Sequence, residues 1–141
     1  MQETPQVGFV CVQNAGRSQM SAAFAETQLA AADATDALDV VTGGTHPADA
    51  VHPEVVTVMA EVGIDVGDQV PRRIGEAELN ACTVVVTMGC STLELDADVE
   101  VRDWALEDPH GQDLQTVRAI RDEIRGRVAA LLDELRVDLR A

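Results

Sequence analysis

Lysine and tyrosine are absent from this chain of 141 residues, and aromatic side chains make up only 2% of it. Its aromatic residues, Phe9, Phe24 and Trp104, are too few for base-stacking platforms or for a flavin site built on stacked rings. The ten strongly basic residues are all arginine and face 25 acidic residues, which gives a formal net charge of −15. A surface this acidic repels nucleic acid and anionic lipid, so we expect neither as a partner.

Long hydrophobic runs are also missing. The apolar runs, such as Val84-Val85-Val86, span only a few residues, whereas a membrane helix needs about 20. Residues 1–5 lack the basic and apolar regions of a secretory signal, so we expect a cytoplasmic protein. The three cysteines and three histidines are dispersed without the spacing of metal ligands, so we expect no metal site.

The acidity has two interpretations, which are docking on a basic partner and adaptation to high salt. At 1 M salt, screening limits charge repulsion to about 3 Å, so an acidic surface keeps a protein soluble there. The acidic residues are scattered along the whole chain rather than gathered in a tail, which favours adaptation to salt and a halophilic source.

Strand-like and helix-like segments alternate along the chain. We expect strands at residues 6–11, 38–42, 83–88 and 99–101, and helices at residues 18–32, 53–63 and 114–136. Gly43-Gly44 is expected to end the second strand. With 46% hydrophobic residues, the chain predicts a single α/β domain over residues 1–141, a three-layer sandwich with a four-stranded parallel sheet between helices. The flavodoxin-like strand order 2-1-3-4 fits this pattern.

The three cysteines fall at two different ends of this sheet. In parallel sheets the functional site lies at the carboxyl ends of the strands. Cys11 ends the first strand and Cys90 follows the third, so both belong at that edge. Cys82 opens the third strand, about 20 Å away at 3.3 Å per residue, so we expect it to be a buried, unreactive side chain.

The segment from Cys11 to Ser18 is a Cys-x5-Arg-Ser loop between a strand and a helix. Successive N–H groups of such a loop converge, and the following helix adds its positive end, so a tetrahedral oxyanion fits there. The same field favours the thiolate of Cys11, the nucleophilic form. Ser18 is expected to donate to the sulfur and Asn14 to pin the loop. The expected oxyanion-binding residues are Val12, Gln13, Asn14, Ala15, Gly16, Arg17 and Ser18. The alternative is a buried structural cysteine beside an ordinary helix start.

A nucleophile of this kind needs an acid for the departing oxygen. Residues 107–111 form a loop with proline and glycine before the last helix, and Asp108 is the candidate acid. The alternative is that Asp108 only caps a turn before Pro109.

Three segments carry a resemblance to a known family: residues 11–20, with Gln19-Met20 after the loop, residues 85–90 and residues 104–109. They resemble the thiol-coupled arsenate reductases on the low-molecular-weight tyrosine phosphatase fold, and the similarity runs over nearly the whole chain. The resemblance implies that Cys11 attacks arsenate, that Arg17 and the loop amides bind it, and that Asp108 protonates the leaving hydroxide. Cys90 would be the resolving cysteine.

The chain departs from this family after Cys90, where residues 91–98 lack the further cysteine that members normally carry. An external thiol is therefore the expected reductant, either a small-molecule thiol or a thioredoxin- or glutaredoxin-like protein, and no bound cofactor is expected. Either the thiol attacks the Cys11 adduct directly, or Cys90 attacks it and leaves a Cys11–Cys90 disulfide. Two other functions stay open: hydrolysis of phosphotyrosine or an aryl phosphate through a phosphocysteine, and oxyanion binding without turnover.

Overall fold

The computed structural model describes residues 5–33, 38–88, 99–104, 106, 107, 109 and 111–140, with side chains as far as residue 135. Within these residues the strands are β1 (Gln6–Cys11), β2 (Asp39–Gly44), β3 (Val84–Thr87) and β4 (Glu100–Asp103). The helices are α1 (Arg17–Ala31), α2 (Pro53–Ala60), α3 (Glu76–Asn80) and α4 (Leu114–Arg140).

All described strand pairs are parallel, and the strand order is β2-β1-β3-β4. The register pairs Cys11 with Gly44, Val10 with Thr87, and Thr87 with Asp103, so the carboxyl ends of all four strands lie along one edge. The predicted α/β sandwich and its 2-1-3-4 order are therefore confirmed.

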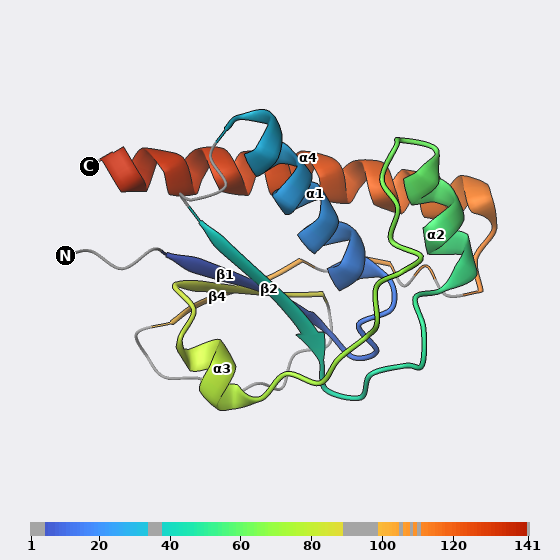
Figure 1. Cartoon of the computed structure of the whole chain (residues 1–141), viewed down its shortest axis with the longest axis horizontal. Coiled ribbons are helices and arrows are strands. Elements are labelled where there is room, and N and C mark those ends of the chain that lie inside the picture. The colour runs from blue at the N-terminus through green and yellow to red at the C-terminus, as the bar shows by residue number, and fades with distance from the viewer. Residues whose placement is uncertain are drawn as a thin grey trace.

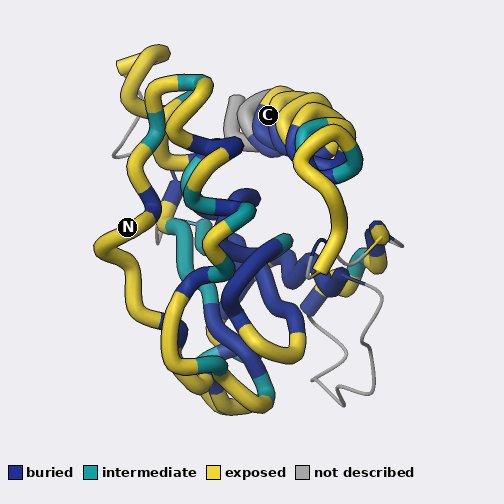
Figure 2. The backbone as a smooth tube through the Cα atoms, turned by 90° about the vertical axis from the view of Figure 1, so that its right-hand side faces the viewer, coloured by how far each residue is buried: buried dark blue, intermediate teal, exposed yellow. Residues whose placement is uncertain are grey.

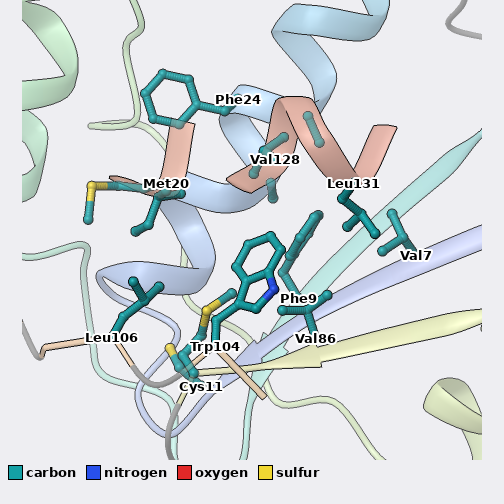
Figure 3. Packing of buried hydrophobic residues seen from close by; sticks show 14 of the residues in the cluster. Val7, Phe9, Cys11, Met20, Phe24, Val86, Trp104, Leu106, Val128 and Leu131 are labelled. Carbon is teal, nitrogen blue, oxygen red and sulfur yellow. The ribbon is translucent and has the colours of Figure 1, made fainter. Parts of the chain in front are cut away.

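The sheet separates two hydrophobic cores, because side chains alternate between its faces. On one face, Phe9 and Val86 pack under α1, α2 and α4, and the ring centroids of Phe9 and Trp104 lie 6.0 Å apart (Figures 1 and 3). On the other face, Val10 and Val85 pack with Leu79 of α3. The short helix α3 was not predicted.

Helix α4 shows the amphipathic pattern that the sequence predicted. Its buried residues recur at steps of three and four positions, and they are Val117, Ile120, Ile124, Val128, Leu131 and Leu135. The opposite side of α4 faces solvent, as the exposed positions in Figure 2 show. The helix continues to Arg140, four residues beyond the predicted end. In the described part of the chain, no helix is both long enough and apolar enough to cross a membrane.

The sequence predicted that the second strand ends at Gly43-Gly44, and this is wrong. Strand β2 runs through both glycines. A Cβ at Gly43 would lie 2.5 Å from Cβ of Ile74, and a Cβ at Gly44 would lie 2.5 Å from the carbonyl oxygen of Val12. Glycine is therefore needed here for close approach rather than for a turn. The contact brings β2 directly against the loop that follows β1.

Candidate active site

The loop 12–16 connects β1 to α1 and is held from outside by a backbone strap, residues 46–52. The amide of His46 donates to the carbonyl of Val12 at 2.8 Å, that of Ala48 to Gln13 at 2.9 Å, and that of His52 to Ala15 at 2.9 Å. The strap thus turns the loop carbonyls away from Cys11.

Because the C=O of one residue and the N–H of the next point in opposite directions across a trans peptide, the loop N–H groups face inward. The amide of Asn14 lies 3.2 Å from Sγ of Cys11, which agrees with this orientation. Inward amides at the start of a helix form a concave site for an anion. The outward carbonyls and the Asn14 amide thus give the loop an orientation that is compatible with an oxyanion beside Cys11.

Asn14 is fully buried and adopts a φ of 51°, a left-handed conformation that asparagine tolerates. Its Oδ1 accepts a hydrogen bond from the backbone N–H of Arg72 at 3.1 Å. Since that N–H can only donate, the amide orientation is fixed and Nδ2 must be the group that faces Ser18 and Thr42. Nδ2 donates to Ser18 Oγ at 2.8 Å and to Thr42 Oγ1 at 2.9 Å.

This orientation determines the direction of the next hydrogen bond. Ser18 Oγ accepts from Asn14, so its own proton is available for Cys11 Sγ, 2.9 Å away. Thr42 Oγ1 uses its proton on the carbonyl of Phe9 at 2.8 Å. Cys11, which is 3% exposed, thus receives hydrogen bonds from a hydroxyl and from an amide N–H.

Arg17 begins α1 and reaches across the carboxyl edge of the sheet. Its Nη1 donates to the carbonyl of Met88 at 2.6 Å, just after β3, and to the carbonyl of Leu106 at 2.9 Å. These neutral acceptors orient the guanidinium without neutralising its charge. Arg17 therefore presents its guanidinium at the site, with further N–H groups that are suited to an oxyanion.

A hollow of about 250 Å³ opens over this arrangement, which is room for a tetrahedral oxyanion. Its lining residues are Cys11, Val12, Gln13, Gly16, Arg17 and His52. The sequence placed five of these in the site and did not place His52 there. The link that brings His52 here is the hydrogen bond from its amide to Ala15, a long-range contact with no local sequence signal.

Asp108 and Cys90 lie outside the described residues, but residues near Asp108 contact the site. The carbonyl of Leu106 holds Arg17. A Cβ at Gly16 would lie 3.0 Å from Cγ of Pro109. The amide of Gly111 lies 3.4 Å from Oε1 of Glu54 at the start of α2. The described parts of the segment 106–111 therefore pack against both the loop and α2, and Leu106 lies near Cys11 in Figure 3.

Cys82 sits at the other end of the sheet, as predicted. Its Sγ accepts a hydrogen bond from Gln6 Nε2 at 3.4 Å, and it packs in the second core with Leu79 and Val85. Burial raises the pKa of the Cys82 thiol, which disfavours its reactive thiolate. Among the described residues, no three histidine, cysteine or acidic side chains come together in a group that could hold a metal ion.

Two more polar residues of the site were not found from the sequence. Gln19 is buried, and its Nε2 donates to the carbonyl and to Oδ1 of Asn14, both at 3.1 Å. Thr42 contributes the hydroxyl described above from β2. The available signal for Gln19 was a polar residue one position after Ser18, on the face of α1 that must be buried against the loop.

Comparisons with known proteins agree with this geometry. A sequence profile described as low molecular weight phosphotyrosine protein phosphatase matches residues 6–141. A Halobacterium salinarum protein, named as a candidate arsenate reductase, is 58% identical over 136 residues, 96% of each chain. The glutaredoxin arsenate reductase of Synechocystis sp. is 35% identical over 133 residues, 92% of this chain and 97% of that one. A solved structure described as an arsenate reductase in the phosphate binding state has a TM-score of 0.78 and 33% identity, covering 93% of this chain and 98% of that chain.

Proposed function

Because this chain belongs to the arsenate reductases of the low molecular weight phosphotyrosine protein phosphatase family, we propose that it reduces arsenate to arsenite through a covalent adduct on Cys11. A thiol supplies the electrons. The reaction consumes reduced thiols, so the cytoplasm, where thiols are kept reduced, is the compartment that fits it.

One observation carries the proposal, which is the inward orientation of the loop N–H groups around Cys11 Sγ. The amide of Asn14 and the hydroxyl of Ser18 already meet the sulfur, at 3.2 and 2.9 Å. We assign to the same amides and to Arg17 the binding of the oxygens of a tetrahedral anion beside that sulfur, which their place at the hollow supports. The nucleophile and its substrate therefore share one binding site.

In the first step the Cys11 thiolate attacks arsenic, so that an S–As bond forms and an As–O bond breaks. The departing oxygen needs a proton, and Asp108 is our candidate donor. The contacts of Leu106 with Arg17 and of Pro109 with Gly16 support this assignment, because they bring the residues around Asp108 to the loop. The N–H groups of the loop stabilise the charge that develops on the remaining oxygens.

In the second step a thiolate attacks Cys11 Sγ, so that an S–S bond forms while the S–As bond breaks. The electron pair of the S–As bond stays on arsenic, which is reduced from As(V) to As(III) and leaves as arsenite. The two sulfurs are oxidised to a disulfide, which a further thiol then reduces. We assign the attacking thiol to Cys90 or to an external small thiol. The final reductant of the disulfide is a small thiol or, alternatively, a glutaredoxin- or thioredoxin-like protein.

The test is parallel turnover of arsenate and of an aryl phosphate by one preparation. Arsenate reduction is measured with a small thiol, with a glutaredoxin system and with a thioredoxin system, each beside the Cys11→Ser variant. We expect thiol-dependent arsenite production that Cys11→Ser abolishes, since a hydroxyl lacks the nucleophilicity of a thiolate. Rapid aryl phosphate hydrolysis without arsenite production would identify a phosphatase, and oxyanion binding without either activity would identify a binding module.

A further inference from the structure

His52 differs from the other described residues of the hollow, because it comes from the strap and not from the segment 11–17. Its ring lies beside the loop, with Cδ2 3.5 Å from the position of a Cβ on Gly16. Its backbone is held on both sides. The amide donates to the carbonyl of Ala15 at 2.9 Å, and the carbonyl accepts from the amides of Val55 and Val56 in α2 at 3.0 and 3.1 Å. The imidazole therefore projects from a rigid support.

The hollow has to attract a dianion to a protein whose net charge is −15. Arg17 supplies one full positive charge there, and its Nη1 is used to hold two carbonyl groups. An imidazole titrates near pH 6.5, and an adjacent anion favours its charged form. A second cation at the mouth would therefore strengthen binding of a doubly charged anion.

We propose that His52 is a substrate-binding residue that, as an imidazolium, binds the outer oxygens of a tetrahedral dianion in this hollow. The inference rests on the proposed function only for naming the anion as arsenate. Binding itself extends to any tetrahedral dianion, including sulfate and phosphate. It also assigns His52 a role distinct from that of Arg17, because an imidazolium can lose its proton near neutral pH and a guanidinium cannot.

Charged and titratable groups share the lining of the hollow with this imidazole or lie close to His52 or Pro109 in sequence. Cys11 and Arg17 lie with it in the lining of the hollow, Glu54 follows it on α2, and Glu107 precedes Pro109. The other ionisable residues close to His52 in sequence are His46 and Asp49 on the strap. The thiolate and the carboxylates favour the imidazolium and Arg17 opposes it, so the test compares variants at His52 and does not rely on a titration alone.

Sulfate is the best probe, because it stays a dianion from pH 5.5 to pH 8 and only protein groups can then change its affinity. Calorimetric binding of sulfate is measured in a Cys11→Ser background, which removes the titrating thiol. We expect the affinity to fall as pH rises across this range. His52→Gln should weaken binding about tenfold at pH 5.5 and remove most of the pH dependence. His52→Lys should bind well and with little change across the range, since it keeps a positive charge.

His46→Gln is the matched control. The His46 side chain is exposed and its Nδ1 lies 3.3 Å from Thr45 Oγ1, while its contact with the loop is through the backbone amide. This control should bind sulfate with the affinity and pH dependence of its parent. If His52→Gln binds sulfate as tightly as its parent, or if His52→Lys is as weak as His52→Gln, the proposal is wrong.

Turnover separates this inference from the proposed function. In otherwise wild-type protein, His52→Gln should raise KM for arsenate by roughly three- to tenfold and change kcat less than about twofold. An unchanged KM in an active reductase would refute the role of His52 and leave the reductase function standing. Sulfate binding that depends on His52, in a protein that does not reduce arsenate, would refute the function and keep the binding residue.

Discussion

Replacing Asn14 with Asp tests how the hydrogen bonds around Cys11 are directed. The two side chains have the same shape, and both tolerate the left-handed backbone at φ 51°. The acceptor for the Arg72 amide is retained. The donor to Ser18 is lost, however, because a carboxylate oxygen replaces Nδ2. The Ser18 hydroxyl should then turn its proton from Cys11 Sγ to the new carboxylate.

The size of the effect follows from the bond that is lost. A hydrogen bond to a charged group contributes about 1.5–3 kcal/mol, which corresponds to roughly a 10- to 150-fold lower rate. The added negative charge acts in the same direction, because it disfavours both the thiolate and the bound anion. The carboxylate keeps most partners of Asn14, so we expect a loss of folding stability of only about 1–3 kcal/mol.

The assay combines two measurements, which are initial rates of arsenate reduction at saturating thiol and the rate of alkylation of Cys11 by iodoacetamide at pH 7. Both should fall in Asn14→Asp. Ser18→Ala removes the same hydrogen bond and should cause a similar loss. Thr42→Val is the matched control, because it removes the other Nδ2 partner without redirecting Ser18, and its rate should stay within about threefold of wild type.

A double-mutant cycle gives the decisive result. If Asn14 acts through the Ser18 proton, the double variant should lose far less activity than the product of the two single losses, since both remove one bond. Losses that multiply would refute this account, as would an Asn14→Asp enzyme with wild-type activity and alkylation rate.

Four other outcomes are expected. Asp108→Asn should lower arsenate turnover by roughly 10²- to 10⁴-fold with little change in phosphate affinity, and an unchanged rate would remove Asp108 as the acid. In native protein, iodoacetamide should label Cys82 far more slowly than Cys11, because burial raises the pKa of the Cys82 thiol whereas Cys11 lines the open hollow, and peptide mapping checks the order. The thermal midpoint should rise from dilute buffer to molar salt, because salt screens the repulsion within a chain whose net charge is −15. Equal midpoints in the two buffers would contradict this. The hydrogen bond from Arg118 lowers the pKa of the Glu61 carboxyl from its ordinary 4.5, so the folding stability from this contact is lost as pH falls below about 4.5. In Glu61→Gln, the free energy of unfolding should therefore depend less on pH in this acid range.

The strands and their order were predictable because their signals are local. The run Val84-Val85-Val86 is apolar on both faces, as a central parallel strand must be, and it became β3 between β1 and β4. The Cys-x5-Arg loop was equally predictable, because strand, turn and helix follow one another directly in the sequence. Helix α3 gave no such signal, since it spans five residues and buries only Leu79.

The parts that the sequence did not reveal depend on contacts between distant segments. Gly43 and Gly44 were interpreted as a strand end, but they are required because a Cβ at either position would lie only 2.5 Å from Ile74 or Val12. His52 reaches the hollow through a backbone bond to a residue 37 positions away in sequence, Ala15. No local pattern encodes either approach.

The strap 46–52 holds the loop through main-chain atoms, so amino-acid substitutions in the loop do not remove these hydrogen bonds. The carbonyls of Val12 and Gln13 are bound whatever side chains these residues carry, and both side chains are exposed at the rim of the hollow. Substitutions there can reshape the entrance while the inward amides keep their positions. The shape of the entrance and the placement of the amides are thus separately variable, so side chains at the rim can change without rebuilding the hydrogen bonds around Cys11.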